Sequence, residues 1–233
     1  LVGKDATYET VIRHALLNTD IITTVSESLK ESTYANFKLD KEIKVIPNFI
    51  DFSRFAKQSV NHFKKAIATS GERIVVHVSN FRRLKRVDNV VHVFRKIQEK
   101  IPAKLLLVGD GPTRMSVEKI CREYDICDKI SFLGKQEAVE EILSVSDLFL
   151  MPSESESFGL AALEAMACEV PVVSSNIGGI PEVNVEGETG YMLDVHDIDG
   201  MAEKSIHILE DDERLNRFKQ NAYKHALKYK ITA

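Results

Sequence analysis

The sequence predicts an α/β protein whose core is a doubly wound parallel sheet. From Arg73 onward, short apolar stretches alternate with segments that have the apolar period of an amphipathic helix. The expected strands are apolar at nearly every position, which indicates that helices cover both faces of the sheet. This alternation is typical of an open, Rossmann-like domain, in which ligands bind at the carboxyl ends of the strands.

The alternation of apolar stretches with helical periods predicts the bounds of each strand and helix in this domain. The expected strands are 74–78, 104–108, 129–133, 147–151, 170–174 and 190–193. The expected helices are 87–99, 112–124, 136–144, one that opens at Gly159, 198–210 and 212–229. Pro112 would begin its helix, a position that suits proline because the N–H there has no helical partner. The segment 177–183, with two glycines and a proline, is expected to be a loop at the same edge of the sheet.

The first part of the chain predicts a smaller unit. Helices are expected over 7–17 and from the cap Ser26 to about 36, and strands over 21–25 and 43–46. The stretch 48–59 is polar and irregular, which indicates a domain boundary. We therefore divide the chain into residues 1–55 and 56–233, the second unit beginning with a helix over 60–68.

Composition excludes several classes of protein. The 233 residues carry a formal net charge of −4, which argues against a general nucleic-acid binder. No stretch approaches the roughly 18 apolar residues of a membrane span, and the first residues do not resemble a signal peptide. We therefore expect a cytoplasmic protein without integral membrane contact. The chain does not begin with Met, so we expect it to be a fragment. Its scattered cysteines and histidines show no metal-ligand spacing, and no metal site is predicted.

The stretch 152–167 carries the strongest signal for a ligand. An apolar strand enters a serine-rich, acidic turn, and the following helix has Gly159 at its start. A glycine there lets a ligand approach the free backbone N–H groups, and the helix dipole favours an anion. Glu164 lies among alanines in that helix, and a buried carboxylate needs a partner. Glu156 and Glu164 would face one cleft; the alternatives are a solvated loop acid and a distant ion pair.

A basic run follows the expected strand 74–78. Four cationic side chains fall within residues 82–86 of a chain that is acidic overall. At the carboxyl end of a strand such a run can form an anion pocket, in which Arg offers a bidentate fork and Lys a point charge. A solvated basic loop is the alternative.

Glycine turns follow two further strands, at Gly109 and Gly111 and at Gly134. They permit close approach of a ligand, but plain βα turns explain them equally well. The spacing is not the G-x-G-x-x-G fingerprint, which disfavours a dinucleotide oxidoreductase.

Together these motifs resemble the nucleotide-binding half of a retaining glycosyltransferase of family 4, with the two-domain GT-B architecture. The matching stretches are 45–51, 79–86, 108–112, 132–134 and 156–160 with Glu164, the last being the family's E-x7-E motif. Within the family, 79–86, 132–136 and 178–183 are closest to enzymes that transfer N-acetylglucosamine to L-malate in bacillithiol biosynthesis. Residues 2–5 resemble a segment on the acceptor side of those enzymes.

The resemblance implies a role for each residue. Lys85 matches the lysine that holds the donor diphosphate, and Glu156 the acid that contacts the donor sugar. Asn80 stands where many relatives have arginine, and Arg82 would replace it. The amides of Phe158, Gly159 and Leu160 would bind the diphosphate, Glu164 the ribose hydroxyls, and Gly134 and Lys135 would lie near the uracil. Thus Glu156, Lys85 and Arg82 are the catalytic candidates. The remaining donor-binding candidates are Ser79, Gly109, Gly111 and Ser157.

The resemblance also implies the partners. The donor would be UDP-N-acetylglucosamine and the acceptor L-malate, bound through an N-terminal domain of which residues 1–55 would be the end. No cofactor and no metal are expected, homo-oligomer formation is left open, and this chain alone would bind UDP weakly without turnover. Two alternatives remain: a family 4 transferase with a polysaccharide or lipid acceptor, and a non-catalytic module that binds nucleotide sugars.

Overall fold

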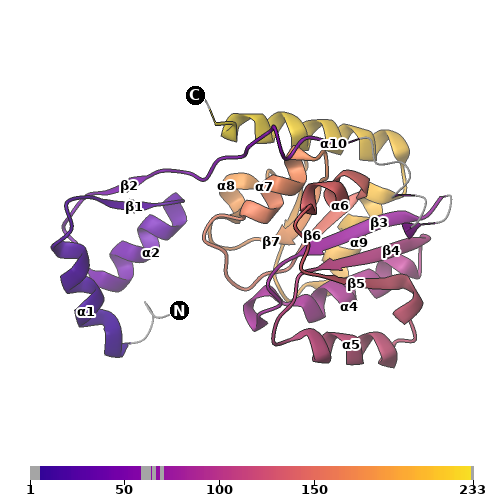
Figure 1. Cartoon of the computed structure of the whole chain (residues 1–233), viewed down its shortest axis with the longest axis horizontal. Coiled ribbons are helices and arrows are strands. Elements are labelled where there is room, and N and C mark those ends of the chain that lie inside the picture. Colours follow the sequence, from indigo (N-terminus) through magenta and orange to yellow (C-terminus); the bar gives the residue numbers. More distant parts are fainter. Residues whose placement is uncertain (1–5, 59–63, 65–66, 69–70, 232–233) are drawn as a thin grey trace.

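The computed structural model describes residues 6–58, 64, 67–68 and 71–231. The segment 2–5 and most of the helix expected over 60–68 lie outside the described residues. The first part of the chain forms α1 (Ala6–Leu17), β1 (Ile22–Thr24), α2 (Glu27–Phe37) and β2 (Ile43–Val45). β1 and β2 pair in parallel as a two-stranded sheet that is separate from the main sheet, as Figure 1 shows. Whether this unit is the end of an acceptor domain stays a prediction.

The main sheet is fully parallel among its named strands. It contains β3 (Arg73–Val78), β4 (Ala103–Val108), β5 (Ile130–Gly134), β6 (Leu148–Met151), β7 (Val172–Ser175) and β8 (Gly190–Leu193). The spatial order is β5-β4-β3-β6-β7-β8. The chain moves outward from β3 to β5 and then returns to place β6 on the other side of β3. The strand order therefore reverses between β3 and β6, where an open α/β sheet binds its ligand.

Helices cover both faces of this sheet, so the predicted fold class is confirmed (Figure 1). They are α4 (Val87–Gln98), α5 (Arg114–Glu123), α6 (Val139–Val145), α7 (Leu160–Ala167), α8 (Ile180–Val183), α9 (Ile198–Leu209) and α10 (Asp212–Ala226). The 3₁₀ turns are Arg83–Lys85, Cys127–Lys129 and Leu227–Tyr229. Consecutive strand residues alternate between two cores: Ile74 and Val76 pack with α6 and α7, whereas Val75 packs with α4 and α9.

Four features differ from expectation, and in the first two a hydrogen bond competes with the helix. Pro112 precedes the first residue of α5, since the amide of Thr113 donates to the carbonyl of Phe81 at 3.1 Å. α6 begins at Val139, since the side chain of Gln136 bonds back to the carbonyl of Leu133. The expected loop 177–183 contains the short helix α8. α10 ends at Ala226 and continues as a 3₁₀ turn to Tyr229.

The connector between the two units is irregular as expected, but it is anchored. Ile50 is 2% exposed and its amide donates to the carbonyl of Tyr229 at 2.8 Å. Arg54 reaches α6, where it pairs with Glu140 at 3.2 Å. The connector therefore lies alongside the C-terminal end of the chain, where Ile50 pairs with Lys230 (Figure 1).

Candidate functional site

The structure joins Lys85 and Glu156 at the point where the strand order reverses. Lys85 lies in the loop after β3 and Glu156 in the loop after β6, and their charged groups are 2.5 Å apart. The hydroxyl of Ser153 also donates to the carboxylate of Glu156 at 3.0 Å. The two side chains are 21% and 14% exposed, so they face a partly enclosed space in which a charge pair is weakly screened.

The loop that carries Lys85 is anchored by a buried aromatic. Phe81 is fully buried and adopts a left-handed backbone conformation with φ of 40°. Its carbonyl accepts from the amide and the hydroxyl of Thr113 at the start of α5, at 3.1 and 2.6 Å. A non-glycine residue at positive φ is costly unless its surroundings hold it. The loop that carries the basic run is thus anchored at Phe81 and is not wholly solvated.

His77 supports the same loop from beneath. Its ring is fully buried, with Nδ1 2.8 Å from the carbonyl of Leu150 and Nε2 2.8 Å from the hydroxyl of Ser79. Only a donor at Nδ1 satisfies the carbonyl, so Nε2 accepts the proton of Ser79. Burial lowers the pKa of His77 to about 4, which keeps the ring neutral at physiological pH.

Gly109 and Gly111 accommodate the chain's own backbone. A Cβ added at Gly109 would lie 1.7 Å from the carbonyl oxygen of Ser79, and one at Gly111 would lie 2.1 Å from that of Asn80. These contacts support the interpretation of Gly109 and Gly111 as part of a plain βα turn. The two glycines let the basic loop lie across the end of β4. Gly134 also has a positive φ, of 66°, but differs because no atom would meet an added Cβ.

Other predicted residues lie at the edge without side-chain partners. Asn80, Arg82 and Lys135 are exposed, and among the described residues none has a side-chain hydrogen bond or ion pair. The turn at Gly109 nevertheless contacts the end of β5 next to Lys135, since the amide of Gly109 donates to the carbonyl of Gly134 at 2.7 Å. The structure brings Lys85 and Glu156 into contact and leaves the functions of these exposed side chains as predictions.

The start of α7 has backbone N–H groups that no side-chain cap within the described chain engages. No side chain among the described residues caps this helix, whose first residue follows Gly159 at φ of 96°. Phe158 is buried against Tyr229, with ring centroids 5.8 Å apart, and fixes the turn. The amide groups of an uncapped first turn, together with the helix dipole, form a site suited to an anion.

Glu164 lies in the second turn of α7 and is partly buried. No hydrogen bond or ion pair engages its carboxylate among the residues that the structure describes. Burial raises its pKa to about 7, opposed by the charge of Arg54 and reinforced by that of Glu140. The carboxylate foreseen as needing a partner therefore has none within the described chain.

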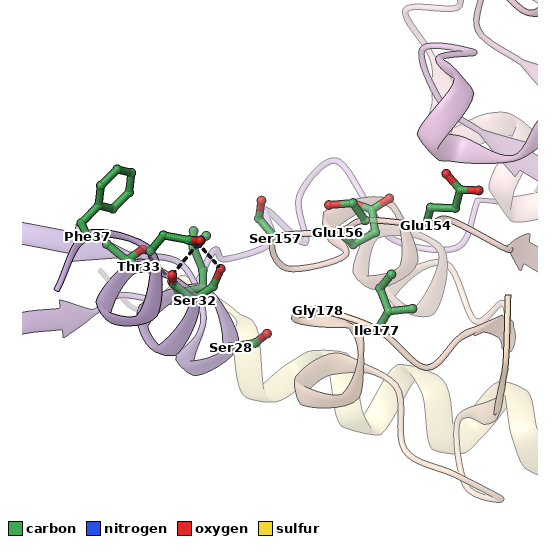
Figure 2. Close-up of a pocket in the computed structure, with 12 residues that line it drawn as sticks. Ser28, Ser32, Thr33, Phe37, Glu154, Glu156, Ser157, Ile177 and Gly178 are labelled. Atoms are coloured by element: carbon green, nitrogen blue, oxygen red, sulfur yellow. Dashed lines mark hydrogen bonds between the residues drawn. The ribbon is translucent and has the colours of Figure 1, made fainter. Parts of the chain in front are cut away.

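A cavity of about 370 Å³ lies between α2 and the Glu156 turn. Figure 2 shows hydroxyl side chains of α2, Ser28 and Thr33 among them, on one side and Glu156 on the other. Ile177 and Gly178 complete the wall. The cavity is lined by both polar and apolar groups and is large enough for a sugar ring, and the first unit of the chain supplies one of its walls.

Sequence reasoning missed His77 as a contributor to this region, and it missed the contacts that Ser26 and Glu182 make between the two units. The hydroxyl of Ser26 donates to the carbonyl of Ser157 at 2.6 Å, in addition to capping α2 as predicted. The carboxylate of Glu182 accepts from two amides of α2. His77 is a polar residue in an otherwise apolar strand, and this could have been noticed in the sequence. No sequence pattern indicates the long-range contacts of Ser26 and Glu182.

Comparison with known proteins gives consistent matches. Residues 59–225 match the family model described as "Glycosyl transferases group 1". Over 214 residues the chain is 44% identical to N-acetyl-alpha-D-glucosaminyl L-malate synthase of Bacillus anthracis. The aligned region covers 91% of this chain and 56% of that protein. The chain therefore spans about half the length of this relative.

Solved structures share the fold. Sucrose-phosphate synthase from Thermosynechococcus elongatus matches with a TM-score of 0.85 and 26% identity, over 97% of this chain and 58% of that one. Anabaena HepE, crystallised with UDP and glucose, matches with a TM-score of 0.85 over 91% of this chain and 59% of that one. Its identity of 19% is evidence for the fold alone.

Two kinds of feature are absent from the residues that the structure describes. No helix within them is long and apolar enough to cross a membrane. They also contain no group of three or more His, Cys, Asp and Glu side chains that could hold a metal ion. The expectations of a cytoplasmic location and of a reaction without metal or cofactor stay predictions.

Proposed function

The chain belongs to the group 1 glycosyl transferase family, and from this we propose that it is the donor-binding half of a retaining N-acetylglucosaminyltransferase. The full-length protein would transfer N-acetylglucosamine from its UDP donor to the hydroxyl of L-malate. The acceptor rests on the 44% identity to a malate synthase across 91% of the chain. The donor rests on that relative and on the chemistry of the cleft.

One observation carries the donor assignment: Lys85, Glu156 and the uncapped start of α7 converge at the reversal of the strand order. A nucleoside diphosphate needs a cation and amide donors for its phosphates, and the α7 turn and Lys85 offer both. A ribose needs an acceptor for its hydroxyls, which the unpartnered Glu164 offers. Arg82, exposed in the same loop, would add a second cation.

The proposed catalysis is electrostatic. As the bond between the anomeric carbon and the diphosphate breaks, negative charge grows on the leaving oxygen, and Lys85 and the α7 amides would stabilise it. Glu156 would hold the sugar hydroxyls, and the malate hydroxyl would attack from the face that UDP leaves and pass its proton to the departing diphosphate oxygen. In this scheme Lys85 changes partner from Glu156 to the diphosphate when the donor binds.

Titration calorimetry of this chain with UDP tests the donor site. We expect weak but saturable binding that Lys85→Ala weakens by on the order of 10- to 100-fold, whereas Lys119→Ala, at an exposed lysine on α5, leaves it unchanged. Absence of any binding of UDP by the wild-type protein would remove the proposal. An acceptor panel on the full-length protein separates malate from polysaccharide or lipid acceptors, and binding of UDP without transfer to any acceptor would favour a module without catalysis. Unchanged turnover in Glu156→Ala would remove the sugar contact assigned to Glu156.

A further inference from the structure

Glu182 joins the two units of the chain through a helix start. Its carboxylate oxygens accept from the amides of Glu27 and Ser28, the first residues of α2, at 3.0 and 2.9 Å. The first N–H groups of a helix lack partners within the helix and carry partial positive charge. A carboxylate at this place makes charge-assisted hydrogen bonds. Glu182 thus caps a helix that lies 154 residues away in the sequence.

Ser26 completes this cap. Its hydroxyl accepts from the amide of Leu29 at 3.0 Å and donates to the carbonyl of Ser157 at 2.6 Å. The amides of the first three residues of α2 are therefore all bonded, two of them by Glu182. α7 lacks such a side-chain cap. Of these two helix starts, only that of α7 presents its amides to a ligand.

The helix that carries Glu182 is fixed against the Glu156 turn. The amide of Gly179 donates to the carbonyl of Glu156 at 3.0 Å, and a Cβ at Gly178 would lie 2.0 Å from that oxygen. In addition, the hydroxyl of Tyr229 donates to the carbonyl of Glu182 at 2.6 Å. The carboxylate of Glu182 thus projects from a backbone that has little freedom to move.

These hydrogen bonds link α2, α8 and the turn that carries Glu156 to one another. The carbonyl of Ser157 is held from α2, that of Glu156 is held from α8, and Glu182 ties α8 to α2. α2 forms one wall of the cavity that Glu156 faces (Figure 2). Two links therefore set the distance between the two walls: the bond from Ser26 to Ser157 and the Glu182 cap.

We infer that Glu182 is a positioning residue that sets α2 against the Glu156 turn for the transfer step. This inference rests on the proposed function. Glu182 touches neither Lys85 nor Glu164, so its loss would leave the nucleotide contacts intact. It would instead loosen the wall across which the acceptor must meet the donor sugar.

The test uses the full-length protein with Glu182→Ala, Glu182→Gln and the control Glu188→Ala, an exposed glutamate of the same region. Removing a helix cap costs enough to change a rate about tenfold. We expect kcat/KM for malate to fall about tenfold in Glu182→Ala. The Kd of UDP should change less than about twofold, since no nucleotide contact is lost. Glu182→Gln, which keeps one acceptor oxygen, should be intermediate.

A second readout does not depend on the reaction. Hydrogen exchange, measured by mass spectrometry on peptides covering 26–37, should show faster exchange at Glu27 and Ser28 in Glu182→Ala, with the rest of α2 and the Glu188→Ala control unchanged. Unchanged exchange at these amides would overturn the inference, as would unchanged transfer or a loss of UDP affinity equal to the loss of transfer. If the wild-type protein transfers nothing to malate, the proposed function fails, and the exchange experiment still decides whether Glu182 caps α2.

Discussion

The ammonium group of Lys85 lies 2.5 Å from the carboxylate of Glu156 and joins the loop after β3 to the loop after β6. The residues assigned to the diphosphate and to the sugar are thus paired with each other in this structure. Donor binding would replace this ion pair with two ligand contacts, so each partner's removal has a different consequence.

Lys85→Ala should weaken UDP binding by on the order of 10- to 100-fold, because a charge-assisted contact is lost. Glu156→Gln should retain or improve UDP binding, because the ammonium of Lys85 no longer has a competing carboxylate. The same variant should lower transfer by on the order of 100-fold if the sugar contact acts in the transition state. Calorimetry with UDP and initial rates measure both, and parallel losses of UDP binding in the two variants would contradict the assigned roles.

Glu164 predicts a pH dependence of nucleotide affinity. Its pKa is raised from 4.5 to about 7 by burial, and hydroxyl donors bind the ionised form better. UDP affinity should therefore rise between about pH 6 and pH 8 beyond the change due to the phosphate itself. Glu164→Gln isolates this part, because only the phosphate titrates in that variant. An identical pH profile in the two proteins would exclude Glu164 from the nucleotide site.

The same carboxyl group affects stability with the opposite sign. An acid whose folded pKa is raised favours the protonated folded state, so its ionisation removes stability as pH rises from 4.5 to about 7. Without ligand, Glu164→Gln should melt a few degrees above the wild type at pH 8. The two should converge near pH 4. A lower melting temperature of the variant at pH 8 would indicate a partner for the carboxylate.

His77→Phe should keep the aromatic packing and lose both hydrogen bonds. The buried carbonyl of Leu150 would remain unsatisfied, a loss of about 1–3 kcal/mol in the free energy of unfolding. The wild-type ring has a pKa of about 4 against 6.5 unfolded, so its contribution is lost as pH falls through this range. Chemical denaturation at pH 7 and pH 4.5 should thus give a smaller difference at the lower pH; an equal difference at both would contradict a neutral His77.

The glycines of the site separate into two kinds. Gly109→Ala places a Cβ against the carbonyl of Ser79 and should destabilise the fold by more than about 3 kcal/mol while displacing the basic loop. Gly134→Ala meets no atom and should cost only the left-handed backbone penalty, about 1–2 kcal/mol. Thermal melting compares the two, and equal losses would show that the backbone contact at Gly109 is unimportant.

The fold was predictable because apolar strands and helical periods are local signals. The boundaries that failed, at Pro112, Gln136 and α8, depend on contacts with segments far along the chain or on back-bonds that no period reveals. Lys85 and Glu156 were predictable as candidates because each follows a strand, but their pairing required the strand order. Glu182 was visible as part of a motif, whereas its partner, the start of α2, was not.

The most direct measurement incubates the full-length protein with UDP-N-acetylglucosamine and L-malate and follows the products by NMR. The account predicts release of UDP together with a malate glycoside in the α configuration, and loss of both in Lys85→Ala. UDP release without the glycoside, transfer to another acceptor, or a β-linked product would contradict it.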